Sequence, residues 1–316
     1  MKSFWDKLKK PFLVLAPMEN VTDTVFRQII VKCAAPDVFF TEFTSTDSLL
    51  SAKPDDAMKR LKFTKVERPI VAQIWGNDPE KYLKSAKIIS DLGFDGIDIN
   101  MGCPDRHIVK KGCCSGLINN PTLAKEIVSA AKEGAKNLPV SVKTRLGYRS
   151  ISMEWAETLL KLNLPALTIH GRTVSEMSKV PAHWDEIKNI VEMKNNISKN
   201  TLIIGNGDVK SYNEAIEKVG QTGADGIMIG RGIFSNPWIF SESVKPEDTL
   251  LQKKINLLID HINLFTKTYD NKKHYEIMKK FYKMYINDFP NAGAIRAQLM
   301  ALSTPEETVE FLKNIE

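Results

Sequence analysis

The sequence predicts a (β/α)8 barrel, the TIM-barrel fold, followed by a small all-helical C-terminal domain. Short apolar or β-branched runs recur eight times up to Gly230, and most are followed by a helical pattern. Several runs are apolar at consecutive positions, as expected for parallel strands that are covered on both faces. Eight such units in roughly 240 residues match the usual length of this barrel, about 250 residues.

The strands and helices are expected in regular alternation. In chain order, the eight strands are Phe12–Ala16, Val38–Phe43, Ile70–Trp75, Gly96–Asn100, Val140–Thr144, Ala166–His170, Thr201–Gly205 and Gly226–Gly230. Amphipathic segments between them predict helices over Pro79–Leu92, Pro121–Lys136, Met153–Leu162 and Ser211–Val219. Two of these helices begin with proline, which a first helical turn tolerates. The long connection Ser45–Arg68 predicts one further helix.

A doubly wound parallel sheet is the alternative architecture for alternating strands and helices. Its nucleotide site requires a glycine-rich turn after the first strand. In this sequence that turn reads Pro17-Met18-Glu19-Asn20, without glycine. The sequence therefore favours the barrel.

The alternation ends at about Ser241. The remaining chain predicts three helices, Leu250–Asp270, His274–Asn287 and Ala292–Leu302, which are broken at Pro290 and Pro305. We therefore expect two domains, a barrel over residues 1–240 and a helical domain over residues 241–316.

The composition is that of an ordinary globular protein. Of the 316 residues, 43% are hydrophobic and 26% are charged. No apolar run approaches the ~20 residues that cross a bilayer, and the apolar stretch after the basic N-terminus is too short for a signal peptide. We therefore expect a cytoplasmic protein that does not enter a membrane. The net charge of +6 allows a polyanionic partner without requiring one.

Four cysteines are present, Cys33, Cys103, Cys113 and Cys114, and no two of them form a CxxC pair. Adjacent cysteines make a poor zinc pair, so we expect free thiols in a reducing compartment and no metal site. Cys33 fits the pattern of a small buried apolar residue.

Polar residues and glycines gather at the C-terminal ends of the expected strands, where barrel enzymes build their active sites. From the first strand to the eighth, these ends read Ala16-Pro17-Met18, Glu42, Gln73-Ile74-Trp75-Gly76, Asn100-Met101-Gly102-Cys103-Pro104, Lys143-Thr144-Arg145, His170-Gly171-Arg172-Thr173, Gly205-Asn206-Gly207-Asp208 and Gly230-Arg231-Gly232. Each alone has an ordinary explanation, such as a tight turn or a structural histidine. Their recurrence on matching strand ends predicts a site.

The last two of these motifs predict a phosphate site. Glycines after the seventh and eighth strands let backbone amides approach an anion, and Arg231 adds a cation. Lys143 and His170, on two further strands, suit a ligand that carries additional negative charge. A reduced flavin is such a ligand, and Gln73 could bond its imide edge.

The series of strand-end motifs, with Thr22-Asp23 and the continuation Leu146-Gly147, resembles the dihydrouridine synthase family. The match spans the whole barrel and extends to Phe289-Pro290 and Arg296 in the tail. The resemblance implies an FMN enzyme that takes a hydride from NADPH and reduces the C5–C6 double bond of a uridine in folded tRNA. It also implies that the helical domain binds RNA, and we expect a monomer.

By this resemblance, Cys103 is the acid that protonates C5 while a hydride reaches C6. A free thiol has a pKa of ~8.5, so at neutral pH it mostly retains the proton that it must give. The implied cofactor contacts are Ala16, Pro17, Met18, Gln73, Lys143, His170, Asn206, Gly207, Asp208, Gly230 and Arg231. The implied substrate contacts are Asn100, Arg145, Arg172, Lys279, Lys280 and Arg296.

The sequence departs from the family pattern at several places. The segment Gly112-Cys113-Cys114-Ser115-Gly116 stands where glycine and alanine are usual. Ser178, Val180 and His183 replace Tyr, Gly and Asp, and the tail reads Lys279-Lys280-Phe281 and Met284-Tyr285 in place of Arg-Lys-His and Trp-Tyr. The departures lie where RNA would be recognised, so the target uridine stays open. Cys113 and Cys114 could pack, line the RNA entrance or act as a reserve thiol.

Other functions remain open from the sequence. A flavin barrel could act on a free small molecule, such as dihydroorotate or an enone, or on a ribosomal rather than a transfer RNA. A non-flavin aldolase could use Lys143 as a Schiff-base nucleophile, and a barrel could bind RNA without catalysis. Lysines interleaved with aromatic residues over Lys267–Lys283 favour RNA, although acids and bases balance at eleven each over Ser241–Glu316.

Overall fold

The computed structural model describes residues 3–244, 250–270 and 272–315, and the chain divides into two compact units. The barrel unit comprises residues 1–24, 36–209 and 213–230, and the helical unit comprises residues 25–35, 210–212 and 231–316. The helical unit therefore takes in a segment of the first strand-to-strand connection as well as the C-terminal region.

The barrel unit is built on a parallel sheet. Its strands are β1 (Phe12–Leu15), β2 (Phe39–Phe40), β3 (Thr44–Ser45), β4 (Ile70–Trp75), β5 (Gly96–Met101), β6 (Val140–Arg145), β7 (Ala166–His170), β8 (Leu202–Asn206) and β9 (Gly226–Ile229). They pair in the order β1-β9-β8-β7-β6-β5-β4-β2, and β3 also pairs with β4. A parallel bridge between Val14 and Val38 joins β1 to the chain just before β2, which brings the ring close to closure. The predicted TIM barrel is confirmed.

The second predicted strand, Val38–Phe43, is interrupted in the structure. β2 and β3 are separate two-residue strands, and both pair with β4. Between them the hydroxyl of Thr41 accepts a hydrogen bond from the backbone N–H of Gln73 at 3.1 Å and donates one to the carbonyl of Glu42 at 2.7 Å. The Thr41 hydroxyl thus takes the place of a backbone carbonyl as the hydrogen-bond acceptor, so the regular pairing with β4 is interrupted between β2 and β3.

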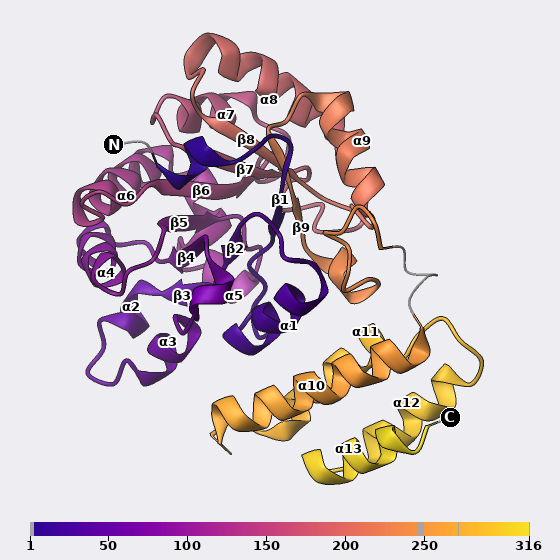
Figure 1. Ribbon diagram of the computed structural model, residues 1–316. Helices are drawn as coiled ribbons and strands as arrows, with labels where there is room; N and C mark the ends of the chain where they lie inside the picture. The colour runs from indigo at the N-terminus through magenta and orange to yellow at the C-terminus, as the bar shows by residue number, and fades with distance from the viewer. Residues whose placement is uncertain (1–2, 245–249, 271, 316) are drawn as a thin grey trace. The chain divides into compact units, whose positions relative to one another are not determined.

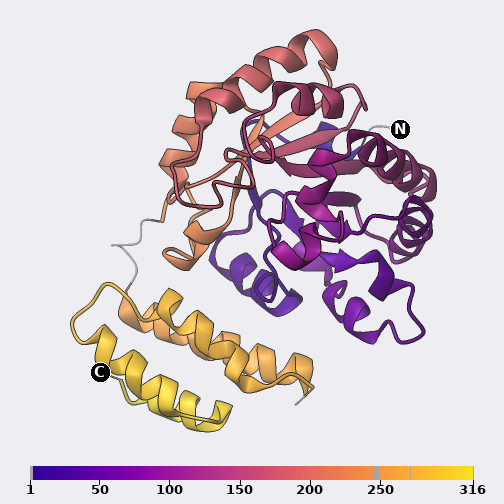
Figure 2. The same cartoon turned by 180° about the vertical axis from the view of Figure 1, so that it is seen from behind.

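Helices alternate with the strands around the barrel unit (Figures 1 and 2). They are α2 (Thr46–Leu49), α3 (Asp55–Arg60), α4 (Pro79–Asp91), α5 (Arg106–Val109), α6 (Pro121–Gly134), α7 (Met153–Leu160), α8 (Trp184–Ile197) and α9 (Tyr212–Thr222). The side chains of Asp78 and Asn120 cap α4 and α6 by accepting backbone N–H bonds, and both helices have the expected proline in the first turn.

The connection Ser45–Arg68 holds two short helices, α2 and α3, and a 3-10 turn, η2 (Lys65–Glu67), where a single helix was predicted. Pro54 immediately precedes α3, and proline cannot continue a helix because it lacks an N–H group. The fully buried carboxylate of Glu67 accepts hydrogen bonds from the hydroxyl of Thr24 and from the backbone of Thr64, both at 2.7 Å. These bonds fix the far end of the connection.

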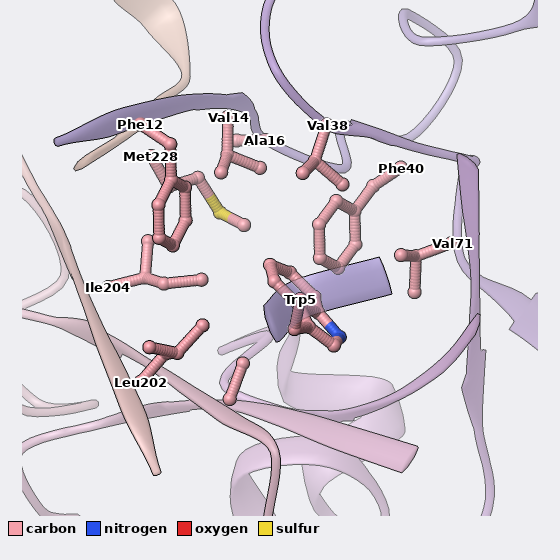
Figure 3. Close-up of a cluster of buried hydrophobic side chains, with 11 residues drawn as sticks. Trp5, Phe12, Val14, Ala16, Val38, Phe40, Val71, Leu202, Ile204 and Met228 are labelled. Atoms are coloured by element: carbon pink, nitrogen blue, oxygen red, sulfur yellow. The ribbon is translucent and has the colours of Figure 1, made fainter. Parts of the chain in front are cut away.

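A short 3-10 turn, η1 (Phe4–Lys7), fills the N-terminal end of the barrel. Its Trp5 is 2% exposed and lies among apolar side chains of β1, β2, β4, β8 and β9 (Figure 3). These neighbours include Phe12, Val14, Phe40, Val71, Leu202, Ile204 and Met228. Because this end is packed with side chains, a ligand site is left to the opposite, C-terminal ends of the strands.

The helical unit contains α1 (Thr24–Ala34), η4 (Arg231–Phe234), α10 (Leu251–Tyr269), η6 (Tyr275–Phe281), α11 (Tyr282–Tyr285), α12 (Ala292–Ala301) and α13 (Pro305–Lys313). The predicted helix His274–Asn287 is a 3-10 turn followed by the single turn of α11. The rings of Phe26 and Phe281 stack at 5.3 Å, and Lys32 forms an ion pair with Asp260 at 2.7 Å. α1 therefore packs with the C-terminal helices.

Within the described ranges, no helix combines the length and the apolarity that spanning a membrane requires.

Candidate active site at the carboxyl ends of the strands

A buried hydrogen-bond network joins β4, β5 and β6. The side-chain amide of Gln73 donates to Asp98 at 2.7 Å and accepts from Nδ2 of Asn100 at 3.0 Å. The other carboxylate oxygen of Asp98 accepts from the hydroxyl of Ser141 at 2.6 Å. Burial raises the pKa of Asp98 to about 6, although its hydrogen bonds and the charge of Lys143 lower it. Asp98 is not part of the strand-end motifs, so those motifs do not predict it. Its position as an acidic residue inside an apolar strand could have indicated a role in the site.

Asn100 shapes the turn that follows β5. Its Oδ1 accepts hydrogen bonds from the backbone N–H groups of Gly102 at 3.0 Å and Cys103 at 2.9 Å. Since Nδ2 is bonded to Gln73, both ends of this amide are engaged within the protein. Asn100 therefore orients the loop carrying Cys103, and its expected contact with uracil or flavin stays a prediction.

Cys103 is a half-buried free thiol with a lowered pKa. A hydrogen bond from the thiol of Cys114 is the largest cause, and the backbone N–H of Asp105 and the charge of Lys143 act in the same direction. Burial opposes them, and the resulting pKa is about 7. The thiol is therefore a stronger acid than the ordinary cysteine expected from the sequence, with about half of it ionised near neutral pH.

Cys114 is the residue behind this shift, and its role was not predicted. Its side chain is fully buried, its φ of 51° lies in the left-handed region, and the next residue, Ser115, donates its backbone N–H to the carbonyl of Cys103 at 3.3 Å. The hydrogen bond to Cys103 and burial together raise the pKa of Cys114 well above that of a free thiol. The sequence signal was the cysteine pair in a segment that is usually glycine and alanine.

Lys143 lies on β6 in register with Asn100 of β5. Burial and the charge of Arg145 lower the pKa of its amine to about 8, while Asp98 and Cys103 raise it. Among the described residues, its Nζ has no hydrogen-bond partner. A half-buried amine of this kind is suited to a ligand that brings negative charge to the barrel mouth.

The guanidinium of Arg145 donates hydrogen bonds to backbone carbonyls. Nε donates to Gly102 at 2.8 Å, and Nη1 donates to Thr173 at 3.0 Å and Met177 at 3.3 Å. The side chain is 7% exposed. Arg145 thus joins the loops that follow β5 and β7, and the structure does not present it as an open RNA contact.

Arg172 bridges His170 and Asp208. It forms an ion pair with Asp208, donates to the carbonyl of Val180 at 2.5 Å, and places Nη1 3.2 Å from Nε2 of His170. Because a guanidinium only donates, Nε2 of His170 must accept, and the proton of the neutral ring then sits on Nδ1. Asp208 also accepts from the backbone of Ala182 at 2.9 Å. Both charged side chains thus hold the loops around His170.

At the strand ends expected to bind phosphate, contacts and backbone conformation within the protein explain some of the residue types but not all of them. Nδ2 of Asn206 donates to the carbonyl of Met228 at 2.8 Å, and Gly207 has φ of 141°, so its conformation itself requires glycine. A Cβ on Gly230, by contrast, would meet only ordinary contacts with Ala16 and Met18, at 3.6 and 3.9 Å. The end of β9 thus adjoins the end of β1, and Arg231 follows directly as the first residue of η4.

A cavity of about 380 Å³ opens beside Cys103. Trp75, Phe43, Arg60 and Asp105 are among its lining residues. Arg60 is held by an ion pair with Glu19. The cavity lies in the size range of small-ligand sites, and it combines aromatic walls, the Arg60 guanidinium, the carboxylates of Glu19, Asp56 and Asp105, and the Cys103 thiol.

The C-terminal residues expected to bind RNA make contacts within the helical unit. Lys279 donates to the carbonyl of Met300 at 2.9 Å and pairs with Glu276 at 2.8 Å. Arg296 donates to the carbonyl of Ile286 at 2.6 Å. Lys280 is exposed and lies 5.0 Å from the ring centre of Phe281. Their part in RNA binding stays a prediction.

The chemistry of the residues at the strand ends is compatible with an anionic ligand such as a flavin phosphate. The free amine of Lys143, the open contact at Gly230 and the adjacent Arg231 supply positive charge and space for an anion. Over the part of the chain that the structure describes, no three His, Cys, Asp or Glu side chains gather in a way that could hold a metal ion.

Comparisons with known proteins identify the family to which the chain is similar. The model of the dihydrouridine synthase family matches residues 14–316. A "Probable tRNA-dihydrouridine synthase" of Staphylococcus epidermidis is 43% identical over 319 aligned positions, which cover 100% of this chain and 97% of the relative. The "Probable tRNA-dihydrouridine synthase 2" of Bacillus subtilis is 42% identical with the same coverage. A solved variant of morphinone reductase in complex with tetrahydroNAD aligns at 12% identity and a TM-score of 0.52 over 72% of this chain and 85% of that one, a likeness of fold alone.

Proposed function

Because this chain belongs to the dihydrouridine synthase family of flavin-dependent oxidoreductases, we propose that it reduces the C5–C6 double bond of specific uridines in tRNA to 5,6-dihydrouridine. FMN is the proposed cofactor and NADPH the proposed hydride source. The observation that carries this proposal is the Cys103 thiol, which borders a cavity and has a pKa of about 7.

The proposed cofactor site uses the carboxyl ends of the strands. Bound FMN supplies the transfer of a hydride from NADPH to C6 of uracil. Gly230 and Arg231 would hold its phosphate, with Asn206 and Gly207 beside them. The amine of Lys143 would stabilise the negative charge of the reduced ring, because it is a cation that no described side chain pairs with. His170 would add a donor through Nδ1, and Gln73 would contact the imide edge.

Cys103 provides the proton in this proposal. When the hydride reaches C6, the Cys103 S–H bond breaks and its proton forms the new bond to C5, which leaves a thiolate on the protein. The hydrogen bond from Cys114 stabilises that thiolate, so it favours the transfer. Asn100 keeps the loop in place by bonding the backbone N–H of Cys103.

We further propose that residues 241–316 form an RNA-binding domain that acts with the barrel, and that the protein works as a monomer in the cytoplasm. The supporting features are the exposed lysines of Lys267–Lys283 and the names of the relatives, whereas Tyr269, Phe281 and Tyr282 of this stretch are buried in the helical unit. The exposed side chains of Lys272 and Lys283 make no hydrogen bond or ion pair with the described residues.

The test is a reaction of purified protein with NADPH and an unmodified tRNA transcript. We expect a yellow protein that releases FMN on heating and forms dihydrouridine at discrete positions, detected by mass spectrometry of the digested RNA. If the protein oxidised NADPH in the presence of an enone or a free pyrimidine and formed no dihydrouridine in RNA, its substrate would be a small molecule and not tRNA.

A further inference from the structure

A second hollow lies on the other side of the Cys103 loop, and we call it the mouth groove. Its volume is about 560 Å³. It is lined by Pro104, Arg106, Val109 and Lys110 of the loop after β5, Tyr148 of the loop after β6, and Val174, Ser175 and Met177 of the loop after β7. Pro104 directly follows Cys103, so the groove begins one residue from the proposed proton donor.

The two charged residues that line the mouth groove are both cations. Arg106 and Lys110 are exposed, and neither makes a hydrogen bond or an ion pair with any described side chain. The nearby acids, in contrast, are engaged. Asp105 accepts from the backbone N–H of His107 at 2.9 Å, and Glu176 accepts from the backbone of Thr173 at 2.7 Å and lies 2.9 Å from the ring of His183.

The groove also offers surfaces for a nucleobase. Met177 is 42% exposed, and Tyr148, which also lines the groove, is half-buried. Single-stranded RNA is bound by aromatic and apolar side chains that stack on its bases, together with cations that contact its phosphates. Both kinds of residue line this groove.

Internal bonds hold the walls of the groove in place. The guanidinium of Arg145 bonds carbonyls of Gly102, Thr173 and Met177, and Ser175 donates its backbone N–H to the carbonyl of Tyr148 at 3.0 Å. The loops after β5, β6 and β7 are therefore fixed relative to one another. A preorganised surface loses less conformational entropy when it binds.

We propose that the mouth groove binds the RNA strand that flanks the target uridine, with Arg106 and Lys110 on its phosphates and with Tyr148 and Met177 against a base. The inference rests on the proposed function and adds to it the surface of the barrel that receives the strand. A uridine in the cavity beside Cys103 would have its neighbouring nucleotide within reach of the groove, because Cys103 lines the cavity and Pro104, the next residue, lines the groove.

The test compares two double charge reversals in the holoenzyme. Arg106→Glu with Lys110→Glu changes the groove, and Lys87→Glu with Lys125→Glu makes the same change of net charge on the outer helices α4 and α6. The side chains of the control lysines are also exposed and make no hydrogen bond or ion pair within the described part of the chain. FMN content and the melting temperature establish that each variant is folded.

We expect the groove variant to raise the Kd for tRNA at least about tenfold and to reduce the slope of log K against log salt by about 1.4, the value for two phosphate contacts on a single strand. The control should stay within about twofold of the wild type. In addition, Tyr148→Ala should lower kcat/KM for tRNA, and Tyr148→Phe should restore it, because stacking needs only the ring.

Equal losses in the two charge variants would overturn the inference, since they would show a general effect of charge. Unchanged tRNA binding with slower flavin reduction by NADPH would also overturn it and assign the groove to the dinucleotide. Failure of the proposed function is a separate outcome, because it would appear as absence of dihydrouridine with the wild-type protein.

Discussion

The thiol of Cys114 donates a hydrogen bond to the sulfur of Cys103, and the pKa values of the two groups move in opposite directions as a result. Cys103 becomes the stronger acid, with a pKa of about 7, and Cys114 keeps its proton. The two thiols therefore have different roles. Cys103 can release a proton, and the buried Cys114 stabilises the thiolate that remains.

Replacement of Cys114 by alanine should move the pH dependence of uridine reduction. Cys103 must be protonated to act as an acid, so the wild-type rate should fall as the pH rises through about 7. Without the hydrogen bond from Cys114, the pKa of Cys103 rises and the fall shifts to higher pH. Single-turnover rates from pH 6 to about 9.5 measure this shift. Cys113→Ala is the matched control and should keep the wild-type profile; a wild-type profile in Cys114→Ala would contradict the assigned role.

Replacement of Cys103 by alanine should separate the two halves of the reaction. The variant should retain FMN and oxidise NADPH at the wild-type rate, but it should lose about 10²- to 10⁴-fold in dihydrouridine formation, the usual contribution of a positioned acid. Stopped-flow absorbance follows the first half and nucleoside analysis follows the second. Robust product from Cys103→Ala, with loss in Cys113→Ala or Cys114→Ala, would mean that another thiol gives the proton.

Replacement of Lys143 by methionine should weaken FMN binding or slow flavin reduction, since it removes the cation proposed to face the reduced ring. In the wild type the amine loses its charge as the pH rises through about 8, so flavin reduction should decline above that pH. The variant should lack this decline. Full FMN occupancy with wild-type reduction rates in Lys143→Met would remove Lys143 from the site.

Charge reversal in the helical unit should weaken tRNA binding without affecting the flavin. Lys280→Glu with Lys283→Glu should lower tRNA affinity and its salt dependence, because both side chains are exposed, and NADPH oxidation should continue. Lys279→Glu should instead lower the melting temperature, since Lys279 donates to the carbonyl of Met300, a bond of about 1 kcal/mol. Unchanged and salt-independent tRNA affinity in the double variant would place RNA recognition elsewhere.

The sequence predicts the barrel well because strand patterns and strand-end motifs are local. It does not predict the break at Thr41, where one hydroxyl competes with a backbone acceptor of the neighbouring strand. The sequence also does not show whether a cationic side chain is available to a ligand or is already bonded within the protein. Arg145 and Arg296 look like RNA contacts in the sequence, yet both guanidinium groups bond backbone carbonyls. Cys114 acts on Cys103 only because a loop brings the two sulfurs together.

The packing of α1 on the C-terminal helices has a consequence for synthesis on the ribosome. Phe26 is made about 250 residues before its stacking partner Phe281, which at 5–20 residues per second is an interval of roughly 10 to 50 s. During that time Phe26 of α1 lacks its ring contacts with His261 and Phe281, although the strands on either side of α1 are already present. The nascent chain should therefore depend on a chaperone that shields this segment, and a product that terminates near residue 240 would expose it permanently.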